Sequence, residues 1–246
     1  EDSDGWRLNG EKIWITAVDQ AQKMLVIART KKVEDVQKRT DGLSMFMIDV
    51  DREGLTYHPI DKVGTRTLSS CSVFFDEVRI EPEELVGTLH GGWKELLDTL
   101  NTERIVTTAG LVGAGDLALR LAVAYANDRK VFGDKPVSAY QGVQFPLAQA
   151  KAEIESARLL NYKAAAQFDI GEPFGSEANA AKLIAAQAVA NATERSMQAM
   201  GGMGYATESH LERLWRDARL FRFAPVSEEM ILNFIAIHDL GMPRSY

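Results

Sequence analysis

The chain has 246 residues, of which 46% are apolar and 26% are charged, and its net charge is −7. This composition is typical of a globular protein with one large domain or two ordinary ones and a sizeable core. A net negative chain without a basic block argues against nucleic acid as a partner. One cysteine and four scattered histidines exclude an intrachain disulfide and give no ligand-like spacing, so we expect no metal site.

The ends and apolar runs of the sequence carry further expectations. No signal peptide is visible, and the longest apolar runs are too short for a membrane span. The opening residues, Glu1-Asp2-Ser3-Asp4-Gly5-Trp6, resemble the middle of a sheet domain, so we expect a fragment of a longer protein.

Residues 6–86 are rich in β-branched and aromatic side chains, which predicts a β domain. Asn9-Gly10, between residues 6–8 and 11–16, predicts a hairpin with a two-residue turn. Further strands are predicted over residues 23–29, 44–50, 54–58 and 72–80, with an exposed charged loop over 31–41.

From Trp93 onward, good helix formers dominate. Helices are predicted over residues 93–128, 138–168, 176–200, 208–217 and 227–239, with Ser227 as the N-cap of the last. The fold class is therefore α+β, with a β domain over residues 1–88 and a bundle of long antiparallel helices over 89–246.

The first predicted helix carries a carboxylate on a regular stripe. Steps of four and three residues place the following residues on one side of the helix: Leu96, Leu100, Glu103, Thr107, Gly110 and Ala114. We expect Glu103 on this seam to be partly desolvated, as suits a general base. The alternative is that Glu103 pairs with Arg104 or with an arginine of a neighbouring helix.

Two short segments could contact a ligand. Trp14 and Thr16 share a face of their strand, where an indole plane and a hydroxyl could cover a flat heteroaromatic ring; the alternative is a core tryptophan beside an edge threonine. Arg129 follows the first helix, with Phe132 close by, and could clamp a phosphate or complement the C-terminus of its own helix.

A glycine segment follows the third long helix. After Gln198, the backbone of Gly201-Gly202-Met203-Gly204 could approach a phosphate or the edge of a flat ring. The alternative is a glycine C-cap, because no strand precedes the segment as a dinucleotide fingerprint requires.

Taken together, these segments resemble the acyl-CoA dehydrogenase family over nearly the whole chain. The resemblance is carried, in the family's order and spacing, by Lys12-Ile13-Trp14-Ile15-Thr16, Gly64-Thr65-Arg66 with Val73-Phe74-Phe75-Asp76-Glu77-Val78-Arg79-Ile80, Arg129-Lys130-Val131-Phe132-Gly133 with Gln141, Gln198-Ala199-Met200-Gly201-Gly202-Met203-Gly204-Tyr205, and Arg216-Asp217-Ala218-Arg219.

The resemblance implies an N-terminal helical domain, a middle β-sheet or barrel domain and a C-terminal four-helix bundle, assembled as a homotetramer (a dimer of dimers). This sequence holds most of the second part and all of the third. The implied location is the bacterial cytoplasm or, in a eukaryote, the mitochondrial matrix.

The implied reaction is α,β-dehydrogenation of an acyl-CoA thioester to the trans-2-enoyl-CoA. A carboxylate removes the α proton, FAD accepts the β hydride, and an electron-transferring flavoprotein receives the electrons. The positions that match FAD ligands are Trp14, Thr16, Arg129, Phe132, Gln141, Gln198, Gly201, Gly202 and Ser227. The positions that match substrate contacts are Asn101, Arg104 and Ala224.

The base is the main departure from the commonest family pattern. Most relatives carry it just before the last helix, where this sequence has Ala224. Some carry it in a Glu-Arg pair on the first bundle helix, which matches Glu103-Arg104 and makes Glu103 the expected base.

A second departure follows Ala224, whose N–H matches the family's donor to the thioester carbonyl. Pro225 replaces a glycine and could re-aim this donor, and Val226 lacks the hydroxyl of a threonine that contacts flavin. These departures leave room for a slow or inactive enzyme. Two other readings stay open: a folded, cofactor-free assembly module that is inactive because its first domain is absent, and an acyl-CoA oxidase that releases peroxide.

Overall fold

The computed structural model describes residues 5–244, except for the side chain of Asp98. The chain divides into two compact units between Thr99 and Leu100, called unit 1 and unit 2 below. The expectation that the chain opens inside a sheet domain concerns residues 1–4, which lie outside the described range.

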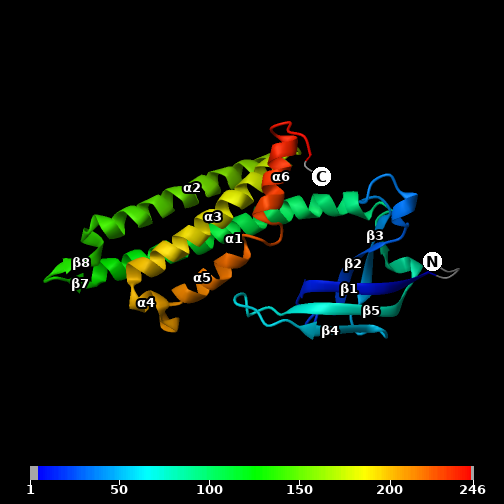
Figure 1. The fold of residues 1–246 in the computed structure, drawn as a ribbon, viewed down its shortest axis with the longest axis horizontal. Coiled ribbons are helices and arrows are strands. Elements are labelled where there is room, and N and C mark those ends of the chain that lie inside the picture. Colours follow the sequence, from blue (N-terminus) through cyan, green and yellow to red (C-terminus); the bar gives the residue numbers. More distant parts are fainter. Residues whose placement is uncertain (1–4, 245–246) are drawn as a thin grey trace. The chain divides into compact units, whose positions relative to one another are not determined.

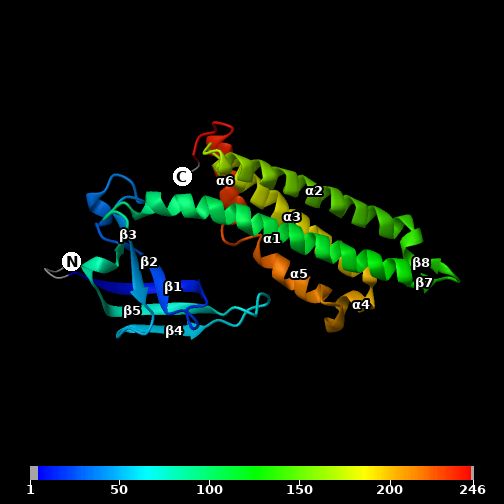
Figure 2. The ribbon, with the colours of Figure 1, turned by 180° about the vertical axis from the view of Figure 1, so that it is seen from behind.

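Unit 1 is built from two three-stranded sheets (Figures 1 and 2). One has the order β1-β5-β4, with strands Trp6–Thr16, Ser70–Ile80 and Leu55–Pro59, and the other has the order β2-β3-β6, with strands Lys23–Arg29, Leu43–Asp49 and Leu85–Val86. The core of the unit includes Val26, Phe46, Ile48, Cys71, Val73 and Val78. The four strands predicted after residue 20 are confirmed to within two residues at each end. The charged loop over 31–41 is confirmed, with one short 3-10 helix (Val33–Asp35) inside it.

The predicted hairpin at Asn9-Gly10 is wrong, because β1 runs through this dipeptide without a turn. Its pairing with β5 is interrupted here, between Leu8 opposite Val78 and Gly10 opposite Phe75. The Asn9 side chain binds the extra residue of β5: its Oδ1 accepts from the Glu77 backbone N–H (2.9 Å) and its Nδ2 donates to the Glu77 carboxylate (2.5 Å). The dipeptide therefore stabilises a β-bulge between distant segments.

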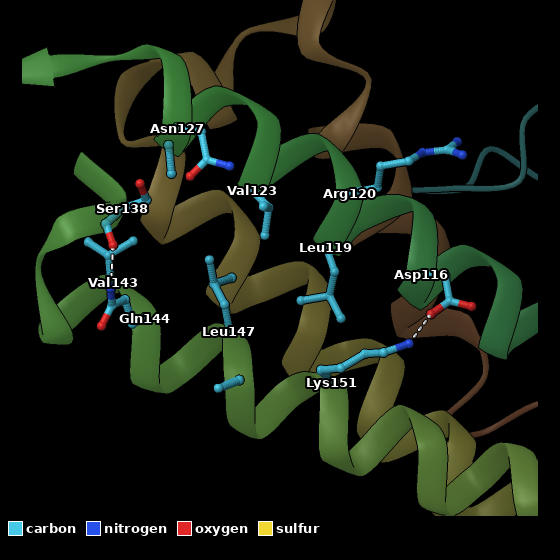
Figure 3. Close-up of a pocket in the computed structure, with 12 residues that line it drawn as sticks. Asp116, Leu119, Arg120, Val123, Asn127, Ser138, Val143, Gln144, Leu147 and Lys151 are labelled. Carbon is cyan, nitrogen blue, oxygen red and sulfur yellow. Dashed lines mark hydrogen bonds and ion pairs between the residues drawn. The ribbon is translucent and has the colours of Figure 1, made fainter. Parts of the chain in front are cut away.

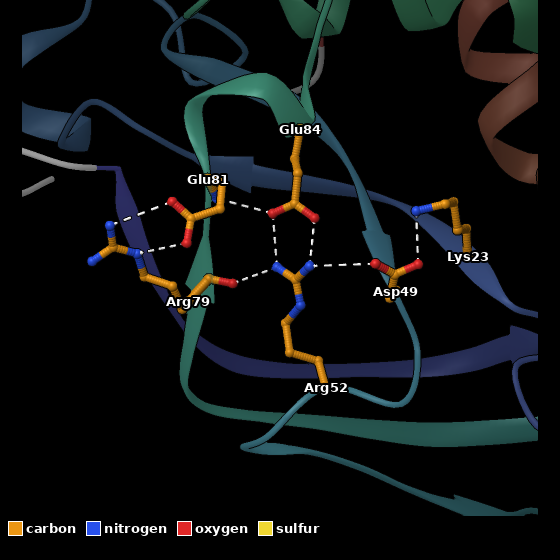
Figure 4. Close-up of polar contacts among 6 residues, drawn as sticks. All are labelled: Lys23, Asp49, Arg52, Arg79, Glu81 and Glu84. Carbon is orange, nitrogen blue, oxygen red and sulfur yellow. Dashed lines mark hydrogen bonds and ion pairs between the residues drawn. The ribbon is translucent and has the colours of Figure 1, made fainter.

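Arg52 links three segments of unit 1 (Figure 4). Its guanidinium donates to both Glu84 oxygens, at 2.7 and 2.5 Å, and to the Arg79 carbonyl at 2.5 Å. The second Glu84 contact is an ion pair whose two side chains are only 19% and 15% exposed, so solvent screens it less than a surface pair. Burial works to raise the pKa of Glu84, but the Arg52 hydrogen bonds and the Glu81 N–H outweigh it, and the pKa lies below its ordinary value.

Replacing Arg52 with Met is expected to lower the free energy of unfolding by about 1.5–3 kcal/mol at pH 7. A depressed carboxylate pKa contributes stability above the unfolded-state pKa, and that contribution is lost as the pH falls through the folded-state pKa. The difference between wild type and Arg52→Met should therefore shrink below about pH 4.5. Thermal melts from pH 7 to pH 3 measure this difference. Arg79→Met, which removes the more exposed pair with Glu81, is the control, and a gap that stays constant with pH would refute this account.

Unit 2 is a helical bundle. Its long helices are α1 (Gly92–Asp128), α2 (Gln141–Asp169) and α3 (Gly175–Met200), which lie side by side in both views (Figures 1 and 2). The shorter elements are α4 (Gly202–Tyr205), α5 (Leu211–Leu220), α6 (Glu228–His238) and the hairpin β7 (Lys130–Val131) and β8 (Lys135–Pro136). The helical C-terminal part and the α+β class are as predicted.

The first turns of α1 belong to unit 1. The Glu95 carboxylate accepts a hydrogen bond from the Thr88 backbone N–H at 3.1 Å, and Gly92 packs against Met45. The units consequently divide inside α1, eleven residues after the predicted boundary at residues 88 and 89.

Helix α5 begins at Leu211, three residues later than predicted. Thr207–Ser209 forms a 3-10 turn, and His210 has a left-handed backbone with φ 59°. This conformation separates the turn from α5 and explains the shift.

By length and composition alone, α1 could cross a membrane, which the apolar runs of the sequence did not suggest. The central helix of a bundle satisfies the same test. Here α1 buries Leu111, Ala118 and Ala122 in a core shared with Ile154 of α2 and Val189 of α3. This packing involves one side of α1, and 39% of its most apolar window is buried.

Candidate active site

Glu103 lies on the exposed side of α1. The face of α1 that packs in the bundle includes Thr108, Leu111, Val112, Ala118, Leu119 and Ala122. Glu103 precedes Thr108 by five residues, which places it about 140° away around the helix. The expectation that Glu103 is partly desolvated is therefore wrong for this chain, because the helix packs through its other side. The stripe of α1 that carries Glu103 is also open at Gly110, where an added Cβ would contact nothing within 4 Å.

The alternative in which Glu103 pairs with an arginine is not observed either. Within the described residues Glu103 forms no ion pair and accepts no hydrogen bond. Arg104 is half-buried and donates instead to the Asn101 side-chain oxygen. Burial lowers the pKa of Arg104, and the Glu103 charge opposes this shift. The Arg104 Nε is buried and has no partner among the described residues, which leaves one donor free for a ligand.

Trp14 is an exposed aromatic side chain on an edge strand. A second bulge, between Lys12 and Ile15, leaves Trp14 with φ 63° and 57% exposed. Ile15 packs against the core of unit 1, whereas Thr16 is exposed like Trp14. The alternative of a core tryptophan is thus wrong, and both side chains are accessible. That they contact a ligand together stays a prediction.

The segment after α1 presents a guanidinium and an aromatic ring to solvent. Arg129 Nη1 donates to the Tyr125 hydroxyl at 2.9 Å, and its guanidinium lies 5.9 Å from the centre of that ring. Phe132 is in the β7–β8 turn with φ 51° and is 94% exposed. Gln141 is exposed in the first turn of α2. Arg129 is held by Tyr125, and all three side chains are exposed and accessible to a ligand.

Gly201 ends α3 with φ 60°, and its N–H donates to the Gln198 carbonyl at 3.2 Å. The C-cap reading is therefore confirmed. The prediction that this segment contacts a ligand stays open. An added Cβ at Gly201 or Gly202 would meet nothing within 4 Å, and the Gln198 side chain is exposed. Backbone with this much open space suits the close approach of a flat ring.

Gly204, in the same segment, is buried against backbone, so Gly204→Ala should destabilise the protein. An added Cβ would lie 2.5 Å from the Met197 carbonyl oxygen and 2.9 Å from its Cα. We expect a loss of about 1–3 kcal/mol in the free energy of unfolding. Gly202→Ala, where space is open, should change it by less than about 0.5 kcal/mol. Urea denaturation compares the two, and equal losses would contradict the packing described.

The turn before α6 contains the predicted carbonyl donor. The Ala224 N–H donates to the Leu220 carbonyl at 3.0 Å, so in this structure it is already bonded. Pro225 follows it through a cis peptide bond. Ser227 is the predicted N-cap of α6, and its hydroxyl accepts from the Met230 N–H at 3.3 Å.

A buried lysine, absent from the sequence predictions, binds this turn from within the bundle. Lys182 of α3 is fully buried, and its Nζ donates to the carbonyls of Phe221 and Val226, both at 2.6 Å. Burial lowers the pKa of Lys182 to about 8; Glu228 acts against this shift and Arg104 adds to it. The sequence did hold a signal for this burial. Lys182 lies at helical spacing from Ala178, Ala185 and Val189, which places it on the same packed face of α3.

A cavity of about 620 Å³ lies between α1 and α2 (Figure 3). Leu119, Val123, Val143 and Leu147 form its apolar part, and Lys151 pairs with Asp116 at its rim at 3.3 Å. None of the predicted ligand residues lines this cavity, and Asp116 is about 20 Å along α1 from Glu103. We therefore do not assign it to the predicted reaction. The described residues hold no group of three or more His, Cys, Asp or Glu side chains suited to a metal ion.

A sheet unit followed by a bundle of long helices defines the α+β class. Comparison with known families identifies the family within this class. The acyl-CoA dehydrogenase middle domain matches residues 1–78, and the acyl-CoA dehydrogenase C-terminal domain matches residues 90–238. The chain belongs to the acyl-CoA dehydrogenase family, whose members are FAD-dependent oxidoreductases of fatty acid metabolism and typically homotetramers.

Relatives occur in bacteria and in mitochondria. The chain is 39% identical to acyl-CoA dehydrogenase FadE12 of Mycobacterium tuberculosis (strain ATCC 25618 / H37Rv), covering 100% of this chain and 63% of that protein. It is 37% identical to the mitochondrial short-chain specific acyl-CoA dehydrogenase of Mus musculus, covering 100% and 58%. A solved glutaryl-coenzyme A dehydrogenase in complex with glutaryl-CoA is 32% identical, with a TM-score of 0.91 and coverage of 99% and 61%. The chain thus spans about three-fifths of the proteins it matches.

Proposed function

We propose that the protein containing this chain is an acyl-CoA dehydrogenase that uses Glu103 as its base. The supporting observation is an exposed carboxylate that has no ion-pair partner among the residues the structure describes. It lies on the same helix as a half-buried arginine, in a chain with alanine at the other base position of the family. Glu103 takes the α proton of the thioester. Its present exposure requires that the bound acyl chain, with the parts of the protein beyond this chain, exclude water around it.

Each unit presents groups that suit part of FAD. In unit 1, Trp14 and Thr16 offer an aromatic plane and a hydroxyl. In unit 2, Arg129 offers a guanidinium for phosphate, in a segment that in the family binds FAD across a subunit interface. Gly201 and Gly202 leave space beside their backbone for a flat ring. When bound, FAD supplies the acceptor for the β hydride. The remaining proposed ligands are Phe132, Gln141, Gln198 and Ser227.

The substrate would be held from α1 and from the turn before α6. Arg104 keeps its charge near Glu103, and its free Nε and the Asn101 amide can orient the thioester end of the substrate. The Ala224 N–H would donate to the thioester carbonyl, for which it must leave or share its bond to the Leu220 carbonyl. Since one such donor typically contributes about 10²-fold in rate or more, this competition predicts a slow enzyme.

We further propose acyl-CoA as substrate, an electron-transferring flavoprotein as electron acceptor, and a homotetramer, in a bacterial cytoplasm or a mitochondrial matrix. The negative net charge gives no support to a nucleic-acid partner. Two of the relatives are named for short acyl chains and for a glutaryl chain, so short acyl-CoAs are the first substrates to test.

An absorption experiment tests the proposal. Full-length protein is mixed with FAD, desalted, and titrated anaerobically with straight and branched acyl-CoAs. We expect a bound flavin band that bleaches with at least one of them. The existing hydrogen bond from the Ala224 N–H to the Leu220 carbonyl favours the alternative of an inactive assembly module, which predicts no bound flavin band. Peroxide released in air would instead identify an oxidase.

A further inference from the structure

The turn over residues 221–226 is held at both of its ends by one buried side chain. Lys182 reaches it from α3, and its Nζ donates to the carbonyl of Phe221 and to that of Val226, at 2.6 Å each. A fully buried ammonium is costly unless its donors are satisfied, and these carbonyls satisfy two of them. The two contacts fix the separation of the ends of the turn.

A second contact fixes the same turn from the side of α6. Arg222 donates to both Glu228 oxygens, at 2.7 and 2.9 Å, and its carbonyl accepts from the Glu228 N–H at 3.2 Å. Glu228 is buried and also accepts from Gln187 at 3.4 Å. Between these two anchors lies Ala224, whose N–H is the proposed carbonyl donor.

We infer that Lys182 is a positioning residue, which sets where the Ala224 N–H points by tying the Phe221 and Val226 carbonyls to α3. The inference rests on the proposed function for its catalytic part. Its structural part, the fixed turn, stands on the two hydrogen bonds alone.

Amide hydrogen exchange of the full-length protein tests the structural part without any reaction. Lys182→Met keeps the aliphatic stem and removes the donors. Exchange in residues 221–226 should become about tenfold faster or more, because hydrogen bonds from a charged group are among the stronger ones. Lys163→Met, an exposed lysine of α2 paired with Glu177, should leave this exchange unchanged. Equal exchange in wild type and Lys182→Met would overturn the inference.

Flavin bleaching tests the catalytic part. At saturating acyl-CoA, Lys182→Met should bleach about 10²-fold more slowly with a smaller change in substrate affinity, because the donor acts mainly on the developing oxyanion. A folded, flavin-loaded variant that bleaches at the wild-type rate would overturn the positioning role. If the wild-type protein binds flavin but none of the acyl-CoAs bleaches it, the proposed function and the catalytic part of the inference both fail. Hydrogen exchange still decides the structural part.

The pH profile separates positioning from loss of stability. Charged groups face Lys182 from α1 (Arg104) and from α6 (Glu228), the latter paired with Arg222. Because the pKa of Lys182 is about 8, wild-type bleaching should weaken as the pH rises from 7 to 9. The already slow Lys182→Met should not show this change, and an inflection of the same size in both proteins would contradict the role of Lys182.

Discussion

Glu103→Gln is expected to keep flavin binding and to slow anaerobic bleaching by acyl-CoA by about 10²- to 10⁴-fold. A positioned general base contributes a factor of this size, and the amide keeps the shape of the side chain but cannot take the α proton. Stopped-flow absorbance at saturating substrate measures the rate. The thermal stability should change little, because Glu103 is exposed and forms no ion pair or hydrogen bond with the described part of the chain.

Glu172→Gln is the matched control for this test. Glu172 is an exposed carboxylate in the loop between α2 and α3, and the same amide substitution there should leave the bleaching rate unchanged. If Glu103→Gln bleaches at the wild-type rate, another group removes the proton and the assignment of Glu103 fails.

Ile154→Ala is expected to produce the largest loss of stability, about 2–5 kcal/mol in the free energy of unfolding. Ile154 is fully buried in α2, and its side chain fills the space beside Gly115 of α1. Removal of its outer carbons leaves a cavity at the contact between the two helices. Leu159→Ala, on the same helix but 67% exposed, should cost less than about 0.5 kcal/mol.

The contact with Gly115 makes this prediction sharper. An alanine Cβ at position 115 would overlap the Ile154 Cδ1, so Gly115→Ala alone should also destabilise the bundle. Combined with Ile154→Ala, the added methyl group occupies part of the cavity, and the double variant should be more stable than the sum of the single losses predicts. Strictly additive losses, measured by urea denaturation, would show that the two residues do not share this space.

The regular elements were predictable because their signals are local. Helix formers, alternating strand residues and the Ser227 cap each act over a few positions, and the resulting helices and strands agree closely with the structure. The failure at Asn9-Gly10 has the opposite cause. The partner that keeps this dipeptide extended is Glu77, 68 residues away, and no local rule identifies it.

The site was only partly predictable for a related reason. Periodicity places Glu103 on a stripe of α1, but it does not say which of two stripes packs in the bundle, and the packed one proved to be that of Leu111 and Ala118. Similarly, the turn at Ala224 was identified by resemblance, whereas its fixation by Lys182 depends on a contact between segments about 40 residues apart. Local sequence patterns therefore identify the candidate residues, whereas the groups that constrain them come from contacts between distant segments.

The most direct test of the proposed mechanism is a crystal structure of the full-length flavin-loaded protein with a non-reacting acyl-CoA analogue. We expect the Glu103 carboxylate to contact the α carbon of the analogue, on the side of the acyl chain opposite the flavin. An analogue bound with Glu103 pointing into solvent and a different carboxylate at the α carbon would contradict it.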